Sequence, residues 1–403
     1  MTEQSQAFVP QWVRAEPDRV LAFAGHAAHP DGGFAWLDSA GAPVPERPVE
    51  TWITCRTTHV LALAVAQGQD ELRPRVEHGV TALRGLLHDD DNGGWFASAT
   101  AAGPVADHKG AYEHAFVLLA AASAAAIGAE GGRALLDEAL GVFDSRFWQE
   151  EFGLVADSWD RTWSELEPYR GVNANMHTVE ALLAAADVTG DRRWSDRAAR
   201  IVANVVHGFA REHDWRLPEH FDPGWNVRLD YNREKPADQF RPYGVTIGHL
   251  LEWSRLALHV RHALGDEAPA WLLDDARELF ATAVRDGWNV DGAEGFVYTT
   301  DFDGVPVVRN RLHWVIAESL ATAWALHQAT GDEQYARWFA TWAEHAERCF
   351  VDRELGSWCH ELDEHNRPAA TVWEGKPDLY HAYQATLLPQ LPPAASFIGA
   401  VTG

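Results

Sequence analysis

Residues Asp238–Arg255 read DQFRPYGVTIGHLLEWSR, a polar loop that runs through Pro242 and Gly244 into an apolar helix. The first turn of this helix carries His249 and Glu252. Residues three apart lie on one face of a helix. A carboxylate there can hold one imidazole nitrogen and leave the other for proton transfer. The alternative is a helix-end histidine capped by its neighbour, and the rest of the chain decides between the two.

A glycine beside or near an aromatic residue recurs about every 60 to 70 residues along the 403-residue chain. These glycines are Gly33, Gly94, Gly153, Gly224, Gly295 and Gly356. A second set lies between them, at Gly68, Gly128, Gly190, Gly265 and Gly331. Glycine commonly ends a helix in the left-handed conformation, so each of the second set marks a tight turn between two helices. A fixed period indicates a repeat architecture, and six units of this size fill the chain.

The helices beside these turns are of two kinds. One kind is apolar on nearly all sides, as in VEALLAAADV, and the other is amphipathic and charged, as in LLDDARELFATAVRDGW. Six of each predict an all-α fold, an (α/α)6 barrel with short β-hairpins in the loops from outer to inner helices. The predicted outer helices are 11–27, 71–88, 131–146, 192–210, 268–287 and 333–349, and the inner ones 57–67, 110–127, 174–189, 246–264, 312–330 and 378–389. We expect residues 1–403 to form a single catalytic domain.

The composition excludes several classes of protein. A chain that is 46% hydrophobic with 19 Trp can bury a large core, so it is not disordered. A formal net charge of −26 repels nucleic acid and anionic membranes. No apolar run reaches the about 18 residues of a membrane span, and the amino terminus lacks a signal peptide pattern. Three cysteines without ligand spacing suit reduced thiols, so we expect a cytoplasmic protein. We also expect the protein to be a monomer or a homodimer.

Each predicted inner helix has a histidine near its start. They are His59, His114, His177, His249, His313 and His381. These ends face the long loops, where sites are commonly built. A histidine packed in the core is the alternative, and it is strongest for His59 and His313, whose neighbours are apolar. The cations at the same ends are Arg56, Lys109 and Lys376.

Neutral groups at the same ends could bind a sugar. Tyr112 and Asn173 offer hydrogen bonds, and we add Gln239 from the loop before His249. Aromatic rings at these ends could stack on a sugar, although most tryptophans in so aromatic a chain pack the core. The candidates are Trp52, Trp95, Trp225, Trp314 and Trp358.

Four motifs resemble the N-acylglucosamine 2-epimerase family, and within it the branch of aldose-ketose isomerases acting on mannose or sulfoquinovose. They are TCRTTHV at Thr54–Val60, NANMHTVEA at Asn173–Ala181, FRPYGVTIGHLLEWSRL at Phe240–Leu256 and DLYHAYQA at Asp378–Ala385. The resemblance implies an (α/α)6 barrel that acts on free monosaccharides without a metal or other cofactor. It also implies that Arg56, His177, His249, Glu252 and His381 occupy active-site positions.

Aldose-ketose isomerisation fits these residues. A base removes the proton beside a carbonyl, an enediolate forms, and the proton returns one carbon away. Arg56 can stabilise the developing oxyanion. We expect His381 to move the proton between C2 and C1, and His249, oriented by Glu252, to serve ring opening and the oxygen protons. The expected reaction interconverts D-mannose and D-fructose, and also D-lyxose and D-xylulose.

Other functions remain open on the sequence alone. The same two histidines on opposite faces of C2 would make a sugar 2-epimerase, and a sulfosugar would need added positive charge, for which Arg241 is available. A glycoside hydrolase on this barrel would need two opposed carboxylates, with Glu113, Asp222 and Asp301 as candidates. A non-catalytic binding protein and a metal site are further alternatives, although HxH and HExxH spacings are missing from the sequence.

Overall fold

The computed structural model describes residues 8–403, which form two compact units. The first unit comprises Gly25–Ile201, Pro377–Tyr380 and Ala395–Gly403. The second comprises Val202–Lys376, His381–Ala394 and the residues up to Ala24. The single-domain organisation expected from the sequence stays a prediction.

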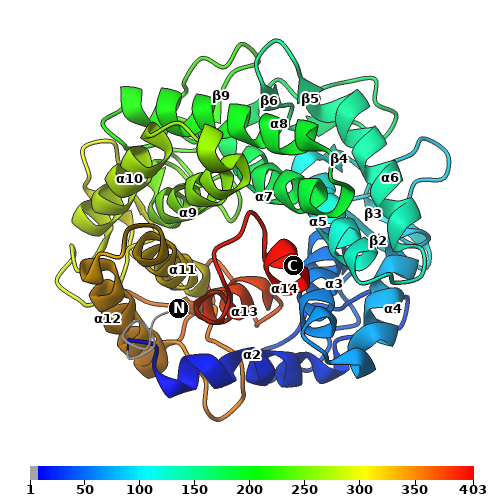
Figure 1. Cartoon of the computed structure of the whole chain (residues 1–403). Coiled ribbons are helices and arrows are strands. Elements are labelled where there is room, and N and C mark those ends of the chain that lie inside the picture. Colours follow the sequence, from blue (N-terminus) through cyan, green and yellow to red (C-terminus); the bar gives the residue numbers. More distant parts are fainter. Residues whose placement is uncertain (1–7) are drawn as a thin grey trace. The chain divides into compact units, whose positions relative to one another are not determined.

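The first unit pairs apolar inner helices with amphipathic outer ones (Figure 1). The inner helices are α3 (Thr51–Ala66), α5 (Ala111–Ala126) and α7 (Val172–Thr189), and the outer ones are α4 (Arg73–Leu83), α6 (Gly132–Val142) and α8 (Arg192–Val202). Helix α5 packs against α3 and α7, while α4 covers α3 and α6 covers α5. The short α14 (Phe397–Thr402) packs on α3 and α7, and Ser396 before it donates to Asp187 Oδ2 at 2.6 Å. Nearly continuous burial explains why the inner helices lack a polar face.

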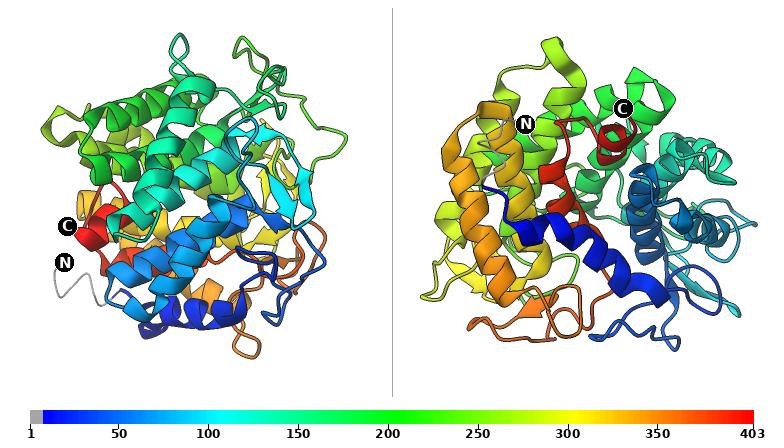
Figure 2. Two further views of the ribbon diagram at one scale, coloured as in Figure 1. Left: turned by 90° about the vertical axis from the view of Figure 1, so that its right-hand side faces the viewer. Right: turned by 60° about the horizontal axis from the view of Figure 1, so that its bottom comes forward.

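The second unit repeats this arrangement. Its inner helices are α9 (Ile247–Leu264), α11 (His313–Thr330) and α13 (Tyr380–Leu387, of which Tyr380 belongs to the first unit), and its outer ones are α2 (Gln11–Phe23), α10 (Trp271–Gly287) and α12 (Glu333–Cys349). Helix α9 packs on α10 and α11, and α12 packs on α11. Helix α2 lies along the lower edge of the left-hand ribbon diagram (Figure 2). Two hydrogen bonds join it to the loop after α12: Arg19 donates to the Asp352 carbonyl at 3.1 Å, and the buried Glu16 accepts from Trp358 Nε1 at 3.0 Å. Short 3-10 or π segments are η1 (Ala24–His26), η2 (Asp70–Leu72), η3 (Phe143–Phe147), η4 (Ala203–Ala210), η5 (Gly265–Glu267) and η6 (Leu388–Gln390).

All strands are short and lie in the loops. They are β1 (Val49–Glu50), β2 (Ser98–Thr100), β3 (Gly103–Ala106), β4 (Lys109–Gly110), β5 (Trp148–Gln149), β6 (Leu154–Val155), β7 (Ser158–Trp159), β8 (Arg170–Gly171), β9 (His220–Phe221), β10 (Val245–Thr246), β11 (Thr299–Thr300), β12 (Pro306–Val308), β13 (Arg311–Leu312) and β14 (Glu361–Leu362). Antiparallel hairpins β2–β3, β5–β6 and β11–β12 lie between outer and inner helices, which confirms the predicted hairpins. The strand before an inner helix also pairs with the following loop, in β1–β2, β4–β7, β10–β11 and β13–β14. These ladders directly precede α3, α5, α9 and α11 and help to fix where those helices begin.

The helix boundaries differ from the prediction at one place that matters for the site. Helix α3 begins at Thr51, six residues before the predicted start at 57, so Arg56 lies inside the helix and not ahead of it. The cause is the local sequence: TWIT is rich in β-branched and aromatic residues and has no capping signal. Burial of Thr51 through Val65 overrides these weak propensities. Arg56 is consequently held by a packed helix.

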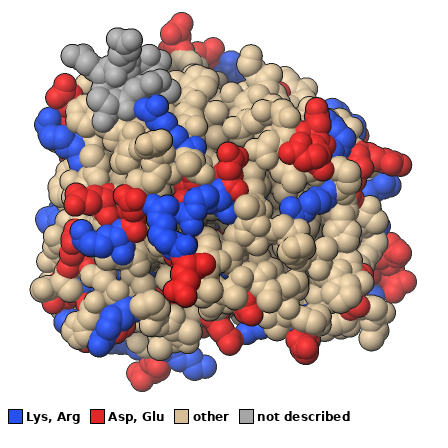
Figure 3. Space-filling view, turned by 90° about the horizontal axis from the view of Figure 1, so that it is seen from below, with Lys and Arg blue, Asp and Glu red and all other residues tan. Residues whose placement is uncertain are grey.

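Two surface properties bear on function. None of the helices within residues 8–403 combines the length and the apolar character that a membrane span needs. On the face drawn in Figure 3, basic side chains lie beside acidic ones, so their charges offset one another there. Such a face offers little attraction to a polyanion.

Candidate active site

Arg56 is the centre of a cluster in the first unit. Its side chain is only 6% exposed, and Nη1 donates to Asp378 Oδ2 at 2.9 Å. Nη2 donates to the Tyr112 hydroxyl at 3.0 Å. The guanidinium carbon lies 4.3 Å from the ring centre of Phe116 and 4.8 Å from that of Tyr380. A buried, always charged donor group is thus fixed by one carboxylate and by aromatic faces.

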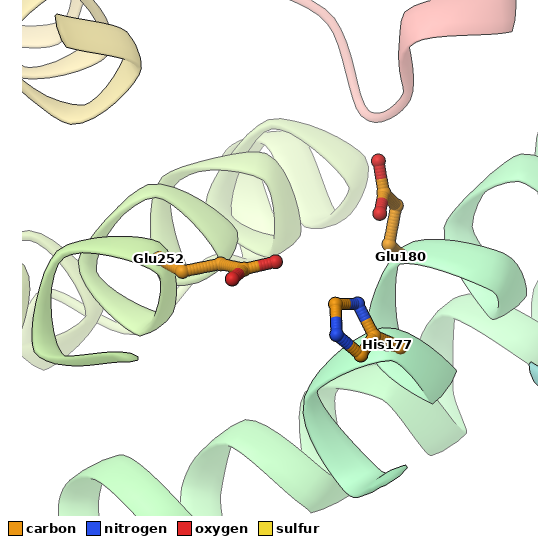
Figure 4. A group of neighbouring side chains, drawn as sticks. All are labelled: His177, Glu180 and Glu252. Atoms are coloured by element: carbon orange, nitrogen blue, oxygen red, sulfur yellow. The ribbon is translucent and has the colours of Figure 1, made fainter. Parts of the chain in front are cut away.

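His177 and Glu180 belong to the same cluster and lie one turn apart on α7 (Figure 4). The His177 ring packs against Phe116 and Tyr112, with centroid distances of 4.6 and 5.3 Å. The Tyr380 hydroxyl donates to Glu180 Oε2. Glu180 therefore binds Tyr380, whose ring packs on Arg56.

His249 lies in the second unit, in the first turn of α9, and is 7% exposed. Its Nδ1 is 2.9 Å from Oε1 of Glu219, a buried residue just before β9. The carboxylate on this ring is therefore Glu219, and the prediction that Glu252 orients His249 is wrong. Glu252 lies 3.6 Å from Nη2 of Arg255, which is also three residues away on α9.

His381 has a matching carboxylate partner. Its Nδ1 is 2.9 Å from Oε1 of Glu318, which comes from α11. Glu318 Oε2 in turn accepts from Arg255 Nε at 2.9 Å. Burial acts to raise the pKa of Glu318, but Arg255 and then His381 lower it below its usual range. Glu318 is therefore a carboxylate, and a carboxylate accepts the Nδ1 proton and leaves Nε2 of His381 as the proton-accepting nitrogen.

The indole of Trp314 contacts both of these histidines. Its ring centre is 5.2 Å from that of His249 and 5.9 Å from that of His381. The interplanar angles, 39° and 38°, are nearly equal. The second unit thus holds two imidazole-carboxylate pairs joined by one aromatic ring.

Three other histidines at the helix starts have structural roles. His59 Nδ1 lies 2.7 Å from Ser123 Oγ, and burial lowers the pKa of His59 to about 3. His114 is bonded to the Gly110 carbonyl and to a backbone N–H, and burial lowers its pKa to about 3. His313 stacks on His360 with a centroid distance of 3.8 Å. The expectation that His59 and His313 are packing residues agrees with these contacts.

The polar groups of several other candidates bind within the protein and stabilise the fold. Lys109 pairs with Asp89 at 2.9 Å and Lys376 with Asp352 at 2.6 Å. Trp95 and Trp358 are fully buried, and each indole N–H donates within the protein. Asn173 lies half-buried in the first turn of α7, and Gln239 lies half-buried in the loop before β10. Arg56, by contrast, donates to Tyr112, a candidate sugar-binding group of the same unit.

Two of the three carboxylates proposed for a hydrolase, Asp222 and Asp301, have turn-forming roles. Asp222 accepts from the backbone N–H of Gly224 at 2.9 Å and of Asn226 at 3.0 Å. Asp301 accepts from two backbone N–H groups of its own turn. The Glu113 side chain folds over Gly110, where a Cβ would lie 2.0 Å from Oε2. None of these three is presented as an opposed acid and base.

One group of side chains in the second unit has ligand atoms at metal-binding separations. Atoms of Glu252, Glu318 and His381 lie within 4.8 Å of one another. The same two carboxylates flank the Arg255 guanidinium. This cation already supplies the positive charge that a metal would bring, so the donor set suits an arginine-linked acid-base group better than a divalent ion.

Sequence reasoning missed four residues of these clusters: Glu219, Arg255, Glu318 and Asp378. Arg255 lies three residues from Glu252. The other three lie much farther from their partners in sequence: Glu219 is 30 residues from His249, Glu318 is 63 from His381, and Asp378 is 322 from Arg56. Asp378 stands in the motif DLYHAYQA and could have been singled out as a carboxylate close to His381. For Glu219 and Glu318, the sequence carries no local signal.

Comparison with known proteins yields a consistent set of matches. Residues 32–385 match the family model described as N-acylglucosamine 2-epimerase (GlcNAc 2-epimerase). D-mannose isomerase of Thermobifida fusca is 56% identical over 392 residues, covering 97% of this chain and 96% of that protein. D-mannose isomerase of Pseudomonas cannabina pv. alisalensis is 50% identical over 400 residues, covering 98% and 95%. A crystal structure of D-mannose isomerase matches with a TM-score of 0.88 at 28% identity, covering 95% of this chain and 98% of that one. These matches confirm the predicted fold class, an all-α (α/α)6 barrel.

Proposed function

The chain belongs to the N-acylglucosamine 2-epimerase family, and we propose that it is an isomerase that interconverts D-mannose and D-fructose. The observation that carries the proposal is the likeness, over nearly the full length, to two D-mannose isomerases. The second substrate pair is D-lyxose, which has the same configuration at C2 and C3 as D-mannose, and D-xylulose. The reaction is an intramolecular proton transfer that needs no net oxidant or reductant.

His381 is proposed as the base that moves the carbon-bound proton. Nε2 takes the proton from C2 of the open-chain aldose, and the C2–H electron pair forms the enediolate double bond while the aldehyde oxygen gains negative charge. Returning a proton from Nε2 to C1, while the proton of O2 moves to O1, gives the ketose. The Glu318 carboxylate supports this role because it stabilises the imidazolium that forms in between.

Arg56 is proposed to stabilise the enediolate. Its guanidinium is buried and fixed by Asp378 and Tyr112, so little reorganisation is needed as charge develops. His249, with Glu219 on Nδ1, is proposed to open the sugar ring and to move protons between O1 and O2. Both assignments are carried over from the family resemblance and are supported by these contacts.

The remaining candidates are proposed as substrate-binding groups. Glu252 and His177 would hold hydroxyls, Tyr112, Asn173 and Gln239 would offer further hydrogen bonds, and Trp314 would pack against the sugar. We also propose that the protein works without a metal, is cytoplasmic, and is a monomer or homodimer. The free cysteines Cys55, Cys349 and Cys359 support a reducing compartment.

The test is incubation of chelator-treated protein with D-mannose, followed by separation of the sugars. Fructose as the main product supports the proposal, whereas glucose as the first product replaces it with 2-epimerisation. No product from mannose would direct the search to sulfoquinovose, with Arg241 as the candidate for its anionic group, and then to oligosaccharides.

Two histidine variants sharpen this test. His381→Gln is expected to abolish exchange of the C2 proton with solvent. His365→Gln, which changes an imidazole that is 63% exposed, is the matched control and should leave the rate unchanged. If the His381 variant kept exchange at C2, the base would be another residue. Light scattering after size-exclusion chromatography decides between monomer and dimer.

A further inference from the structure

Gly248 lies in the first turn of α9, immediately before His249, and is fully buried. A Cβ atom placed there would lie 2.2 Å from Cζ3, 2.6 Å from Cη2 and 2.9 Å from Cε3 of Trp314. Real Cβ atoms do not approach ring carbons so closely. The six-membered ring of Trp314 therefore lies directly on the backbone of α9.

The backbone conformation does not explain this glycine. Gly248 is a helical residue, and its φ is outside the left-handed region that favours glycine. Alanine would be the better residue for the helix itself. Space for the Trp314 ring is thus the physical reason for glycine at 248.

Trp314 has little freedom to move elsewhere. Its indole is 9% exposed and also meets Tyr298 edge-on, with a centroid distance of 6.0 Å and an interplanar angle of 88°. His249 and His381 also pack against the indole. A ring displaced from Gly248 would therefore change its packing against one or both imidazoles.

From these contacts we infer that Gly248 is a positioning residue for both His249 and His381, acting through Trp314. Each imidazole is held at two places: a carboxylate fixes Nδ1, and the indole supports the ring. The inference rests on the proposed function, because it assumes that the His249 and His381 imidazoles are positioned in order to transfer protons. It adds Gly248 as a residue that does not touch the sugar yet controls the rate.

The experiment is a double-mutant cycle of Gly248→Ala and Trp314→Phe. In the otherwise unchanged protein, Gly248→Ala is expected to lower kcat for D-mannose by a factor on the order of 10 to 100, as small misplacements of reacting groups do. KM should change less than kcat, because Trp314 is the one proposed sugar-binding group that the added methyl displaces. The Tm should fall by a few degrees because of the steric overlap. The higher helix propensity of alanine would by itself raise Tm.

Phenylalanine lacks the outer carbons of the indole that a Cβ at 248 would meet. In the Trp314→Phe background, Gly248→Ala should therefore change kcat less than about twofold and should not lower Tm. The matched control is Gly141→Ala in α6, where a Cβ would meet nothing within 4 Å. It should leave kcat unchanged and leave Tm equal or higher.

Each outcome decides the inference. Equal losses in both backgrounds, or no loss in either, would overturn it. If Gly248→Ala alone does not fold, recovery of folding in the double variant supports it, and failure to recover overturns it.

If the protein without substitutions did not convert D-mannose, this result would contradict the proposed function but not the Gly248 inference. The Gly248 inference would then be decided by NMR of 15N-labelled histidine, with the two imidazoles assigned from His249→Gln and His381→Gln. Their signals should shift in Gly248→Ala and stay unchanged in Gly141→Ala. Unshifted signals in Gly248→Ala would overturn the inference independently of the reaction.

Discussion

Oε1 of Glu318 lies 2.9 Å from Nδ1 of His381, and both side chains are almost fully buried. Glu219 makes the same contact with His249, also at 2.9 Å. The two pairs differ in one respect, because the carboxylate of Glu318 also accepts from Arg255. The negative charge of Glu318 is therefore shared between Arg255 and His381. The two imidazoles are therefore equally well oriented but electrostatically distinct.

Glu318→Gln is expected to lower kcat by a factor on the order of 100, because the amide cannot stabilise the imidazolium of His381. If His381 moves the carbon-bound proton, the primary isotope effect with D-mannose deuterated at C2 should increase. Glu219→Gln should lower kcat without increasing that isotope effect, since His249 acts on oxygen-bound protons. The reverse pattern would exchange the roles of the two histidines.

Asp378→Asn tests how Arg56 is held. The change removes the charge paired with a buried guanidinium and keeps an oxygen that can accept from the Tyr380 N–H, now at 2.9 Å from Asp378 Oδ1. Loss of one partner of a buried pair costs about 3–5 kcal/mol of unfolding free energy. We expect kcat/KM for mannose to fall on the order of 10- to 100-fold, since an unfixed Arg56 stabilises the enediolate less well. Urea unfolding and initial rates measure the two effects.

Tyr112→Phe is the control for Asp378→Asn. It removes one neutral acceptor from Arg56 and leaves the aromatic face, so the cost to stability should be about 1 kcal/mol. Equal effects of the two variants would mean that the charge of Asp378 does not hold Arg56.

The sequence predicts the framework better than it predicts the contacts within the clusters. The glycine-marked repeat and the apolar inner helices are local patterns, and the fold follows from them. His249 and Glu252 are three residues apart, a spacing that suggests a pair. Glu252 instead lies beside Arg255, which follows it by three residues. The true partner, Glu219, comes from a loop 30 residues earlier, and Glu318 lies 63 residues before His381. Such pairs depend on which loops and inner helices become neighbours, which no local pattern encodes.

The metal-free mechanism gives a separate prediction. Activity should survive prolonged treatment with EDTA, and added Zn²⁺ should bind the unchanged protein weakly, because Arg255 already neutralises Glu318. Arg255→Met removes that cation from between Glu252 and Glu318, so Zn²⁺ should bind this variant more tightly by calorimetry. Loss of activity on chelation, restored by a divalent ion, would contradict the metal-free mechanism.

The last prediction concerns the half-buried Glu50, the residue before α3. Burial, and then the negative charge of Glu113, raise the pKa of Glu50 from 4.5 to about 7, while Arg47 acts in the opposite direction. Between these two pH values the folded protein holds a proton that the unfolded chain has lost. Stability from this group is therefore fully present below pH 4.5 and is lost as the pH rises through 7.

Glu50→Gln should remove this dependence, because a neutral amide resembles the protonated carboxyl. A rise from 4.5 to about 7 corresponds to about 3 kcal/mol at about 1.4 kcal/mol for each pH unit, and partial solvent screening reduces it to on the order of 1–2 kcal/mol. The variant should therefore unfold at higher urea concentration than the unchanged protein at pH 8.5, and at a similar concentration at pH 4.5. Glu46→Gln removes an exposed carboxylate nearby and is the control. A gain of the same size at both pH values would show that the effect comes from packing and not from the titration of Glu50.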